Sequence, residues 1–235
     1  MFPATSILVV VPRIGMQKNP SIAPRIAQEA GLFEEETVPI STKIINRTTG
    51  QVEAITVTKD EGPRYGTTFE SLFKLRPALS QFSNTTTAGN ASQTTAVLLM
   101  KRGKALHLGQ PILGKFVGAS VAGVPPRIMG IRPTAAIPRI LARFGLETND
   151  IDIYEINEAF ASMAVYCLEA LRLDRQKLNP RGGAIALAHP LAATGARQIV
   201  TALSEARRTK KRLILTSMCV GSGQGMASMI VNEQL

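Results

Sequence analysis

The chain has 235 residues, of which 45% are hydrophobic and 19% charged, a composition typical of a globular protein that buries a core. Its longest aliphatic run, residues 7–11, is far shorter than the roughly 20 residues needed to cross a bilayer, so we expect no transmembrane segment. The two cysteines, Cys167 and Cys219, cannot form a disulfide framework and lie in no metal-binding pattern, so we expect a reducing compartment and no metal site.

The net charge of +10 favours a polyanionic partner, which can be nucleic acid, a membrane surface or a phosphate-bearing ligand. The charge is scattered along the chain, and its densest stretch, residues 205–212, is typical of a solvated connection between a helix and a strand. Tryptophan is absent and tyrosine is scarce, so aromatic platforms for stacking bases are few. We therefore expect no nucleic acid, while charge alone leaves a membrane surface and a phosphate-bearing ligand open.

Residues 1 to about 90 form the less regular part of the chain, because prolines interrupt it repeatedly. Within it, residues 20–31 show apolar side chains at helical spacing, closed by Gly31. Residues 67–77 begin with a capping box and end at Pro77, which predicts a second short helix. We interpret these helices as connecting elements without a core of their own.

From residue 96 onward, apolar runs that predict strands alternate with amphipathic stretches that predict helices. Asn157 is placed to cap one helix and Thr194 to open the next, whose inward face carries Ile199, Val200 and Leu203. This alternation predicts a layered α/β fold. The expected strands are 96–100, 115–124, 151–156, 183–188, 212–218 and 226–232, and the expected helices are 132–145, 157–173 and the segment after 194.

Three candidate functional residues, Asn157, His189 and Cys219, lie where predicted strands end. Such junctions in an α/β sheet gather at one edge, so we expect the three side chains to converge. A histidine can activate a thiol, an asparagine can orient a water molecule, and a cysteine can carry a proton or act as a nucleophile.

Each residue taken alone also has a structural interpretation. Asn157 can be a helix cap, His189 can be satisfied by backbone groups in a turn, and Cys219 can be a small buried apolar residue. The segment GSGQG at 221–225 lacks the spacing of a nucleotide-binding loop. The residues by themselves leave both interpretations open.

Taken together, several segments resemble the thiolase family. NEAFA at 157–161, AHPLAATGAR at 188–197 and CVGSGQG at 219–225 are similar, in order and spacing, to the three C-terminal signatures of thiolases. TAGNASQ at 87–93 resembles a fourth family segment, and residues 123–138 are similar to the peroxisomal 3-ketoacyl-CoA branch. The resemblance extends from about residue 16 to the end of the chain.

The resemblance implies a thiolase-like layered fold and acyl transfer between CoA thioesters, with CoA as substrate and no other cofactor. By motif, it assigns activation of the nucleophile to His189 and transfer of the α-proton to Cys219. Asn157 would hold the water of one oxyanion hole, and the backbone of Gly221 would lie at the other. Ser92 would lie against the pantetheine of CoA.

The sequence also departs from the family pattern. The acylated cysteine of thiolases belongs upstream of the loop region, where this chain has none. Ala188, Ala192 and Arg132 stand where the family usually has glycine. We interpret residues 1–90 as a remnant of the loop domain with an atypical start, 91–105 as the last strand of the N-terminal half, and 106–235 as the C-terminal domain.

Two hypotheses follow. The first is a 3-ketoacyl-CoA thiolase-like acyltransferase of fatty-acid β-oxidation, impaired because its nucleophilic cysteine is absent; the second is a non-catalytic homologue that binds CoA or a full-length thiolase subunit. We expect the matching layer over Ile199, Val200 and Leu203 to be largely missing, and therefore a homo-oligomer or a mixed assembly. The resemblance implies a peroxisomal location, although the ending NEQL is not a peroxisomal address and we expect no targeting signal in this chain.

Overall fold

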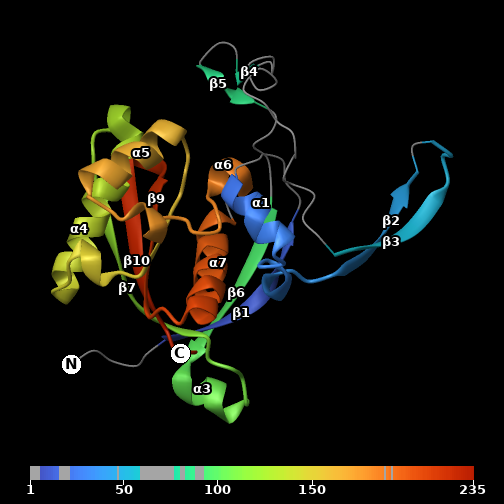
Figure 1. Cartoon of the computed structure of the whole chain (residues 1–235), viewed down its shortest axis with the longest axis horizontal. Coiled ribbons are helices and arrows are strands. Elements are labelled where there is room, and N and C mark those ends of the chain that lie inside the picture. Colours follow the sequence, from blue (N-terminus) through green and yellow to red (C-terminus); the bar gives the residue numbers. More distant parts are fainter. Residues whose placement is uncertain are drawn as a thin grey trace.

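The computed structural model describes residues 6–15, 22–46, 48–58, 77–79, 83–87, 93–187, 189–191 and 193–235. Its centre is a six-stranded sheet of order β6-β1-β7-β10-β9-β8 (Figure 1). Neighbouring strands are antiparallel, except that β8 and β9 are parallel. The strands are β6 (Gln93–Lys101), β1 (Ser6–Gly15), β7 (Gly114–Gly123), β10 (Gln224–Asn232), β9 (Leu213–Val220) and β8 (Ile153–Ile156).

Helices cover both faces of this sheet, which confirms the predicted layered α/β fold. On one face α4 (Pro133–Phe144) packs on β7, β10 and β9, and α5 (Ala161–Ala170) packs on α4. On the other face α7 (Thr194–Thr209) packs on β6, β8 and β9 (Figure 1). The local signals that predicted α4 hold: Pro133 occupies the first turn, and Gly145 ends the helix with a φ of 64°.

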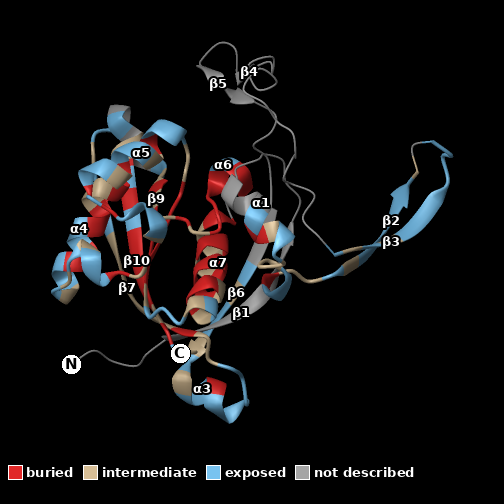
Figure 2. Ribbon diagram, viewed as in Figure 1, coloured by how far each residue is buried: buried red, intermediate tan, exposed pale blue. Residues whose placement is uncertain are grey.

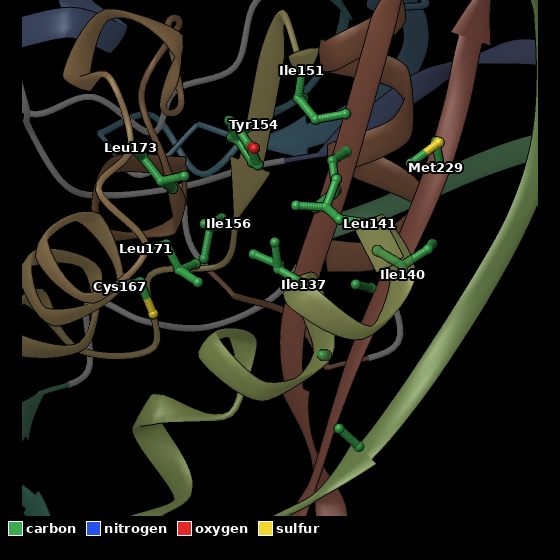
Figure 3. Close-up of a cluster of buried hydrophobic side chains, with 14 of the residues drawn as sticks. Ile137, Ile140, Leu141, Ile151, Tyr154, Ile156, Cys167, Leu171, Leu173 and Met229 are labelled. Carbon is green, nitrogen blue, oxygen red and sulfur yellow. The ribbon is translucent and has the colours of Figure 1, made fainter. Parts of the chain in front are cut away.

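The alternating side chains of the strands feed two hydrophobic clusters, one on each face of the sheet. The larger cluster joins α4 and α5 to the sheet through residues such as Ile137, Ile156 and Cys167 (Figure 3). The smaller cluster joins Leu203 and other residues of α7 to the opposite face of the strands. Because successive strand residues point to opposite faces, Ile156 and Glu155 of β8 face different layers. Glu155 is thereby directed toward α7.

The expectation that α7 would lack cover is wrong for two of its three named residues. Val200 and Leu203 are only 1% and 3% exposed, while Ile199 is half-buried (Figure 2). The acidic turn η1 (Glu34–Glu36) lies against α7: Thr201 donates to the Glu36 carboxylate at 3.3 Å, and Arg207 forms an ion pair with Glu35. This cover comes from a distant part of the chain.

Some local predictions hold and others fail. The helix expected at 20–31 is α1 (Ile22–Glu29), followed by Gly31 at a φ of 69°. The helix expected at 157–173 begins later, at Ala161, with Phe160 and not Asn157 as its N-cap. The segment before His189 ends in a short helix, α6 (Ala184–Leu187), so that junction does not follow a strand. The stretch 67–76 lies outside the described residues.

The remaining elements lie at the periphery. A hairpin of β2 (Ile40–Ile45) and β3 (Val52–Val57) extends away from the body, and β4 (Pro77–Leu79) pairs with β5 (Ser83–Thr87) (Figure 1). None of the helices in the described part of the chain combines the length and apolar character needed to cross a membrane. Short helices complete the fold: α3 (Arg102–His107), η2 (Pro126–Ile131), η3 (Thr148–Asp150), η4 (Arg175–Lys177) and η5 (Gly221–Gly223).

Candidate active site

His189 is held between two polar side chains at the start of α7. Its Nε2 lies 3.3 Å from the side-chain nitrogen of Asn157, which follows β8. Its Nδ1 lies 2.7 Å from the hydroxyl of Thr194, the first residue of α7. The structure thus brings together two of the three residues singled out from the sequence.

The hydrogen bonds of Thr194 determine which nitrogen of His189 carries the proton. The Thr194 hydroxyl donates its single hydrogen to the carbonyl oxygen of Pro190 at 2.9 Å. It must therefore accept a hydrogen from Nδ1 of His189. Nε2 is then the unprotonated nitrogen, and it accepts from the amide of Asn157. This neutral imidazole can take a proton at Nε2.

The environment of His189 favours this neutral form. Burial lowers the pKa of His189 below its ordinary value, and the nearby Arg197 cation lowers it further. An imidazole that stays neutral at neutral pH is a competent general base. The interpretation of His189 as a turn residue satisfied by backbone groups does not describe the contacts in the structure, because both ring nitrogens contact side chains.

Asn157 is fixed by the parallel pairing of β8 with β9. Its backbone N–H donates to the carbonyl of Ser217 at 2.9 Å, one residue beyond the paired residues Ile156 and Ser217. The side chain is fully buried, and its Oδ1 has no hydrogen-bond partner within the described part of the chain. Asn157 does not cap α5; its amide serves His189 instead.

Cys219 lies at the end of β9, two residues beyond Ser217, and therefore at the same edge of the sheet as Asn157. Its side chain, 8% exposed, belongs to the hydrophobic cluster on the α4 and α5 face. Burial raises the pKa of the Cys219 thiol, while a backbone hydrogen bond and the Arg132 cation oppose the rise. The structure places Cys219 near the other two residues along the sheet edge but packs its side chain into another layer.

The two remaining predicted site residues differ in what the structure describes. Gly221 begins the turn η5 between β9 and β10, and a Cβ added there would meet none of the described atoms within 4 Å. Its backbone is therefore accessible to a ligand from that side. Ser92 lies outside the described residues, as do Ala188 and Ala192, the two alanines beside His189.

Sequence reasoning did not identify the role of three residues around this site. Thr194 was recognised only as a helix start, although it contacts His189. Arg132 is 1% exposed and donates to the carbonyl of Val220 at 2.7 Å, beside Cys219. Arg197, also 1% exposed, acts electrostatically on His189. Their burial depends on contacts between distant segments, which no local pattern reveals.

No cluster of three or more metal-binding side chains occurs among the residues that the structure describes. The groups that the structure does bring to this edge are a neutral imidazole, a buried amide and a nearby thiol. An imidazole base beside a donor amide suits a reaction in which a thiol is deprotonated and an oxyanion develops.

Comparisons with known protein families identify the family of this chain. Residues 23–103 match the family model described as the thiolase N-terminal domain, and residues 110–232 match the thiolase C-terminal domain. The chain belongs to the thiolase family. The predicted resemblance is thereby confirmed.

Among curated relatives, the chain is 52% identical over 211 residues to the peroxisomal 3-ketoacyl-CoA thiolase of Yarrowia lipolytica, covering 88% of this chain and 50% of that protein. It is 51% identical over 208 residues to the human peroxisomal 3-ketoacyl-CoA thiolase, covering 86% of this chain and 49% of the human one. The chain therefore spans about half the length of the curated thiolases that it matches.

Solved structures show the same relationship. The acetyl-CoA acetyltransferase of Bacillus anthracis superposes with a TM-score of 0.76 at 38% identity, over 89% of this chain and 52% of that one. The dimeric peroxisomal thiolase of Saccharomyces cerevisiae superposes with a TM-score of 0.71 at 46% identity, over 90% of this chain and 52% of that one. The thiolase-like α/β fold predicted from the sequence is confirmed.

Proposed function

We propose that this chain is a thiolase-type acyltransferase segment that acts on 3-ketoacyl-CoA thioesters, with His189 as the base, and that its own turnover is low. The observation that carries the proposal is the clamped imidazole: His189 holds Nε2 free of a proton, 3.3 Å from the amide of Asn157. The names of the relatives support the substrate class.

The proposed reaction is thiolysis, in which CoA and a 3-ketoacyl-CoA give acetyl-CoA and an acyl-CoA shortened by two carbons. A thiolate adds to the keto carbon, and the bond between the α-carbon and that carbon then breaks. His189 would remove the proton of the attacking thiol at Nε2, and the amide of Asn157 would stabilise negative charge, directly or through water. Because this chain has no upstream cysteine, the attacking thiolate would be that of CoA, and cleavage would give the shortened acyl-CoA directly together with the enolate of acetyl-CoA. Cys219 would supply the proton that the α-carbon gains, and the proton taken up by His189 would restore the Cys219 thiol.

The chain's two cysteines limit this reaction. The family resemblance places the acylated cysteine upstream of the loop region, whereas this chain has only Cys167 and Cys219. Loss of the nucleophile costs about a million-fold in kcat in a serine protease that has been dissected in this way. We therefore expect residual activity only, from the base and the oxyanion site.

Incubation of the purified chain with acetoacetyl-CoA and CoA tests the proposal. Formation of acetyl-CoA, followed by chromatography, should be about a million-fold slower than with a full-length peroxisomal 3-ketoacyl-CoA thiolase. The residual rate should fall further in His189→Ala. Turnover equal to that of the full-length enzyme would contradict the proposed impairment, and a residual rate unaffected by His189→Ala would contradict the role of His189.

A second candidate function, CoA binding without catalysis, is favoured by the state of the two thiols. Both cysteines are buried, and burial raises the pKa of Cys167 to about 11 and the pKa of Cys219 above its ordinary value. Neither is a ready nucleophile. This function predicts that no acetyl-CoA forms in the assay with acetoacetyl-CoA and CoA, and that mass spectrometry of the chain afterwards detects no acetylated cysteine. Calorimetry should nevertheless show saturable binding of CoA.

The cellular setting belongs to the same proposal. The curated relatives are named as peroxisomal enzymes and one solved neighbour as a dimer, which supports a peroxisomal location and an assembly of two thiolase subunits for this chain. The assembly can be a homo-oligomer or a pair with a full-length subunit. Native mass spectrometry of the chain mixed with a full-length thiolase distinguishes these, because the two chains differ in mass.

A further inference from the structure

A fully buried ion pair joins the two elements that hold the candidate base. Glu155 of β8 and Arg197 of α7 are each 1% exposed, and their side chains meet at 2.8 Å. Burial raises the pKa of Glu155, and Arg197 opposes that rise. Such a pair is rarely a net source of stability, because desolvating both charges costs about as much as their attraction returns. Its presence calls for a role other than packing.

The pair joins the same two elements that hold His189. Glu155 precedes Asn157 by two residues, so both project from the same side of the β8 segment toward α7. Arg197 follows Thr194 by three residues, within the first turn of α7. The imidazole therefore lies between Asn157, two positions after Glu155, and Thr194, three positions before Arg197.

A second contact reinforces this connection. The side-chain amide of Gln198 donates to the carbonyl of Glu155 at 2.8 Å and to the carbonyl of Ser217 at 3.2 Å. The first turn of α7 is thus tied to β8 and β9 next to the ion pair. The distance between Asn157 and Thr194, which sets the space available to the imidazole, depends on these ties.

We infer that the buried Glu155–Arg197 pair is a positioning device for His189: it fixes the gap between β8 and α7 in which the imidazole is clamped, and it places a cation behind the ring. Both side chains are only 1% exposed, so neither offers a surface to a substrate. The inference rests on the proposed function only in treating His189 as the base, because the clamp is a property of the folded chain.

The charges around the pair define what a titration should reveal. Arg197 on α7 is the cation that acts on His189. Glu155 is surrounded by Arg197, by Glu158 after β8 and by Glu36 on η1. Oε1 of Glu155 and both Nε and Nη2 of Arg197 have no hydrogen-bond partner in the described part of the chain. The pair is therefore held by a single strong contact. A change in either side chain should alter the tautomer or the pKa of His189.

The test uses NMR of the histidine ring in a His107→Gln background, where His189 is the only imidazole because the chain contains two histidines. The ¹⁵N shifts of Nδ1 and Nε2 report the tautomer, and their pH dependence reports the pKa. In the double variant Glu155→Gln/Arg197→Gln, which removes both charges and keeps amide groups, we expect the pKa of His189 to rise. We also expect the fraction with the proton on Nδ1 to fall.

The matched control is the buried pair Arg181–Glu205, whose side chains are 2% and 6% exposed and meet at 2.8 Å, with Glu205 on the same helix. Arg181→Gln/Glu205→Gln removes a pair of the same chemistry from α7 at a position eleven residues beyond Thr194, away from the first turn that contacts His189. It should leave both the tautomer and the titration of His189 unchanged. Thr194→Val removes the hydroxyl that accepts from Nδ1 and should shift the tautomer of His189. It serves as the positive control for the ¹⁵N shifts.

The outcomes separate the inference from the proposed function. If both double variants leave the His189 signals as in the parent, or if both move them equally, the Glu155–Arg197 pair is structural and the inference fails. If Glu155→Gln/Arg197→Gln does not fold, Arg197→Lys is measured instead, since it keeps the charge but alters the contact; an unchanged tautomer there would overturn the inference. None of these readouts needs turnover, so an inactive chain leaves the inference intact.

Discussion

At the scale of single residues, the site depends on one imidazole whose protonation is set by its neighbours. The Thr194 hydroxyl fixes the proton on Nδ1, and burial with the Arg197 cation keeps the ring neutral. A neutral imidazole can act as a base, but the low pKa of His189 makes the folded chain less stable at low pH. There the unfolded chain binds a proton on this imidazole more readily than the folded chain does.

We expect this cost to appear as a pH dependence of stability. The imidazole of the unfolded chain titrates near its ordinary pKa of 6.5, whereas the pKa of His189 in the folded chain is lower. Between these two values the unfolded chain binds more protons, so the free energy of unfolding rises with pH through the window that ends near 6.5. Urea denaturation between acid and neutral pH measures this slope.

The contribution of His189 is isolated by comparison with His189→Gln, because the raised pKa of Glu155 gives an opposite slope in both proteins. The difference in unfolding free energy between parent and variant should increase with pH. His107→Gln, which retains His189, serves as the control. Parallel curves for the parent and His189→Gln would contradict the lowered pKa.

At the scale of elements, the hairpin of β9 and β10 is held against the start of α4 by a close backbone approach. Gly225 of β10 pairs with Cys219 of β9, and a Cβ added at Gly225 would lie 2.5 Å from the carbonyl oxygen of Arg132. Arg132 in turn donates to the carbonyl of Val220. The hairpin that carries Cys219 and Gly221 therefore requires a residue without a side chain at position 225.

Gly225→Ala should destabilise the chain by about 1–3 kcal/mol, the usual cost of forcing a side chain into a packed site. The backbone carbonyl of Arg132 cannot move aside as a flexible side chain could. Gly123→Ala on β7 is the matched control, since a Cβ there meets no described atom within 4 Å. Equal denaturation midpoints for the two variants would show that the approach at Gly225 is looser than the structure indicates.

Sequence reasoning was most successful for elements whose signals are local. The helix expected at 132–145 is α4, and the helix expected to open at Thr194 is α7. It failed where a local signal competed with a distant contact. Asn157 has the character of a helix cap, but its amide is used by His189, which lies 32 positions away. The cover of α7 by η1 is likewise a long-range contact that no periodicity encodes.

The candidate site was predictable in part for the same reason. The motifs around Asn157 and His189 identified two residues that the structure places in contact. The roles of Cys219, Gly221 and Ser92, and the domain boundaries at 90/91 and 105/106, stay predictions. Arg132, Arg197 and Glu155 could not be found, because a charged residue is interpreted as exposed until its buried partner is known.

At the scale of the whole molecule, the chain exposes an arm. In the hairpin of β2 and β3, the cross-strand pair Ile45 and Val52 is 68% and 65% exposed (Figure 2). An isolated two-stranded hairpin is marginally stable in water, and exposed apolar side chains on it favour association. This arm, and not an uncovered α7, is the structural basis for expecting an oligomer.

We expect the purified chain to sediment as an oligomer, and Ile45→Lys/Val52→Glu to shift it toward monomer. The opposite charges keep the cross-strand pair favourable while removing its apolar surface. Ser41→Lys/Thr56→Glu, at a polar pair of the same hairpin, is the control and should retain the parental sedimentation. A monodisperse parent that melts cooperatively as a monomer would show that the arm does not drive association.

The position of β1 has a consequence for how the molecule is made. This strand lies inside the sheet, between β6 and β7, and Ser6 pairs with Lys101. During synthesis β1 emerges before β6 and β7, so its pairing with both of these neighbours cannot form until they have been translated. The sheet therefore closes late, through contacts of high sequence separation, and the nascent chain depends on being shielded from other strands during that interval.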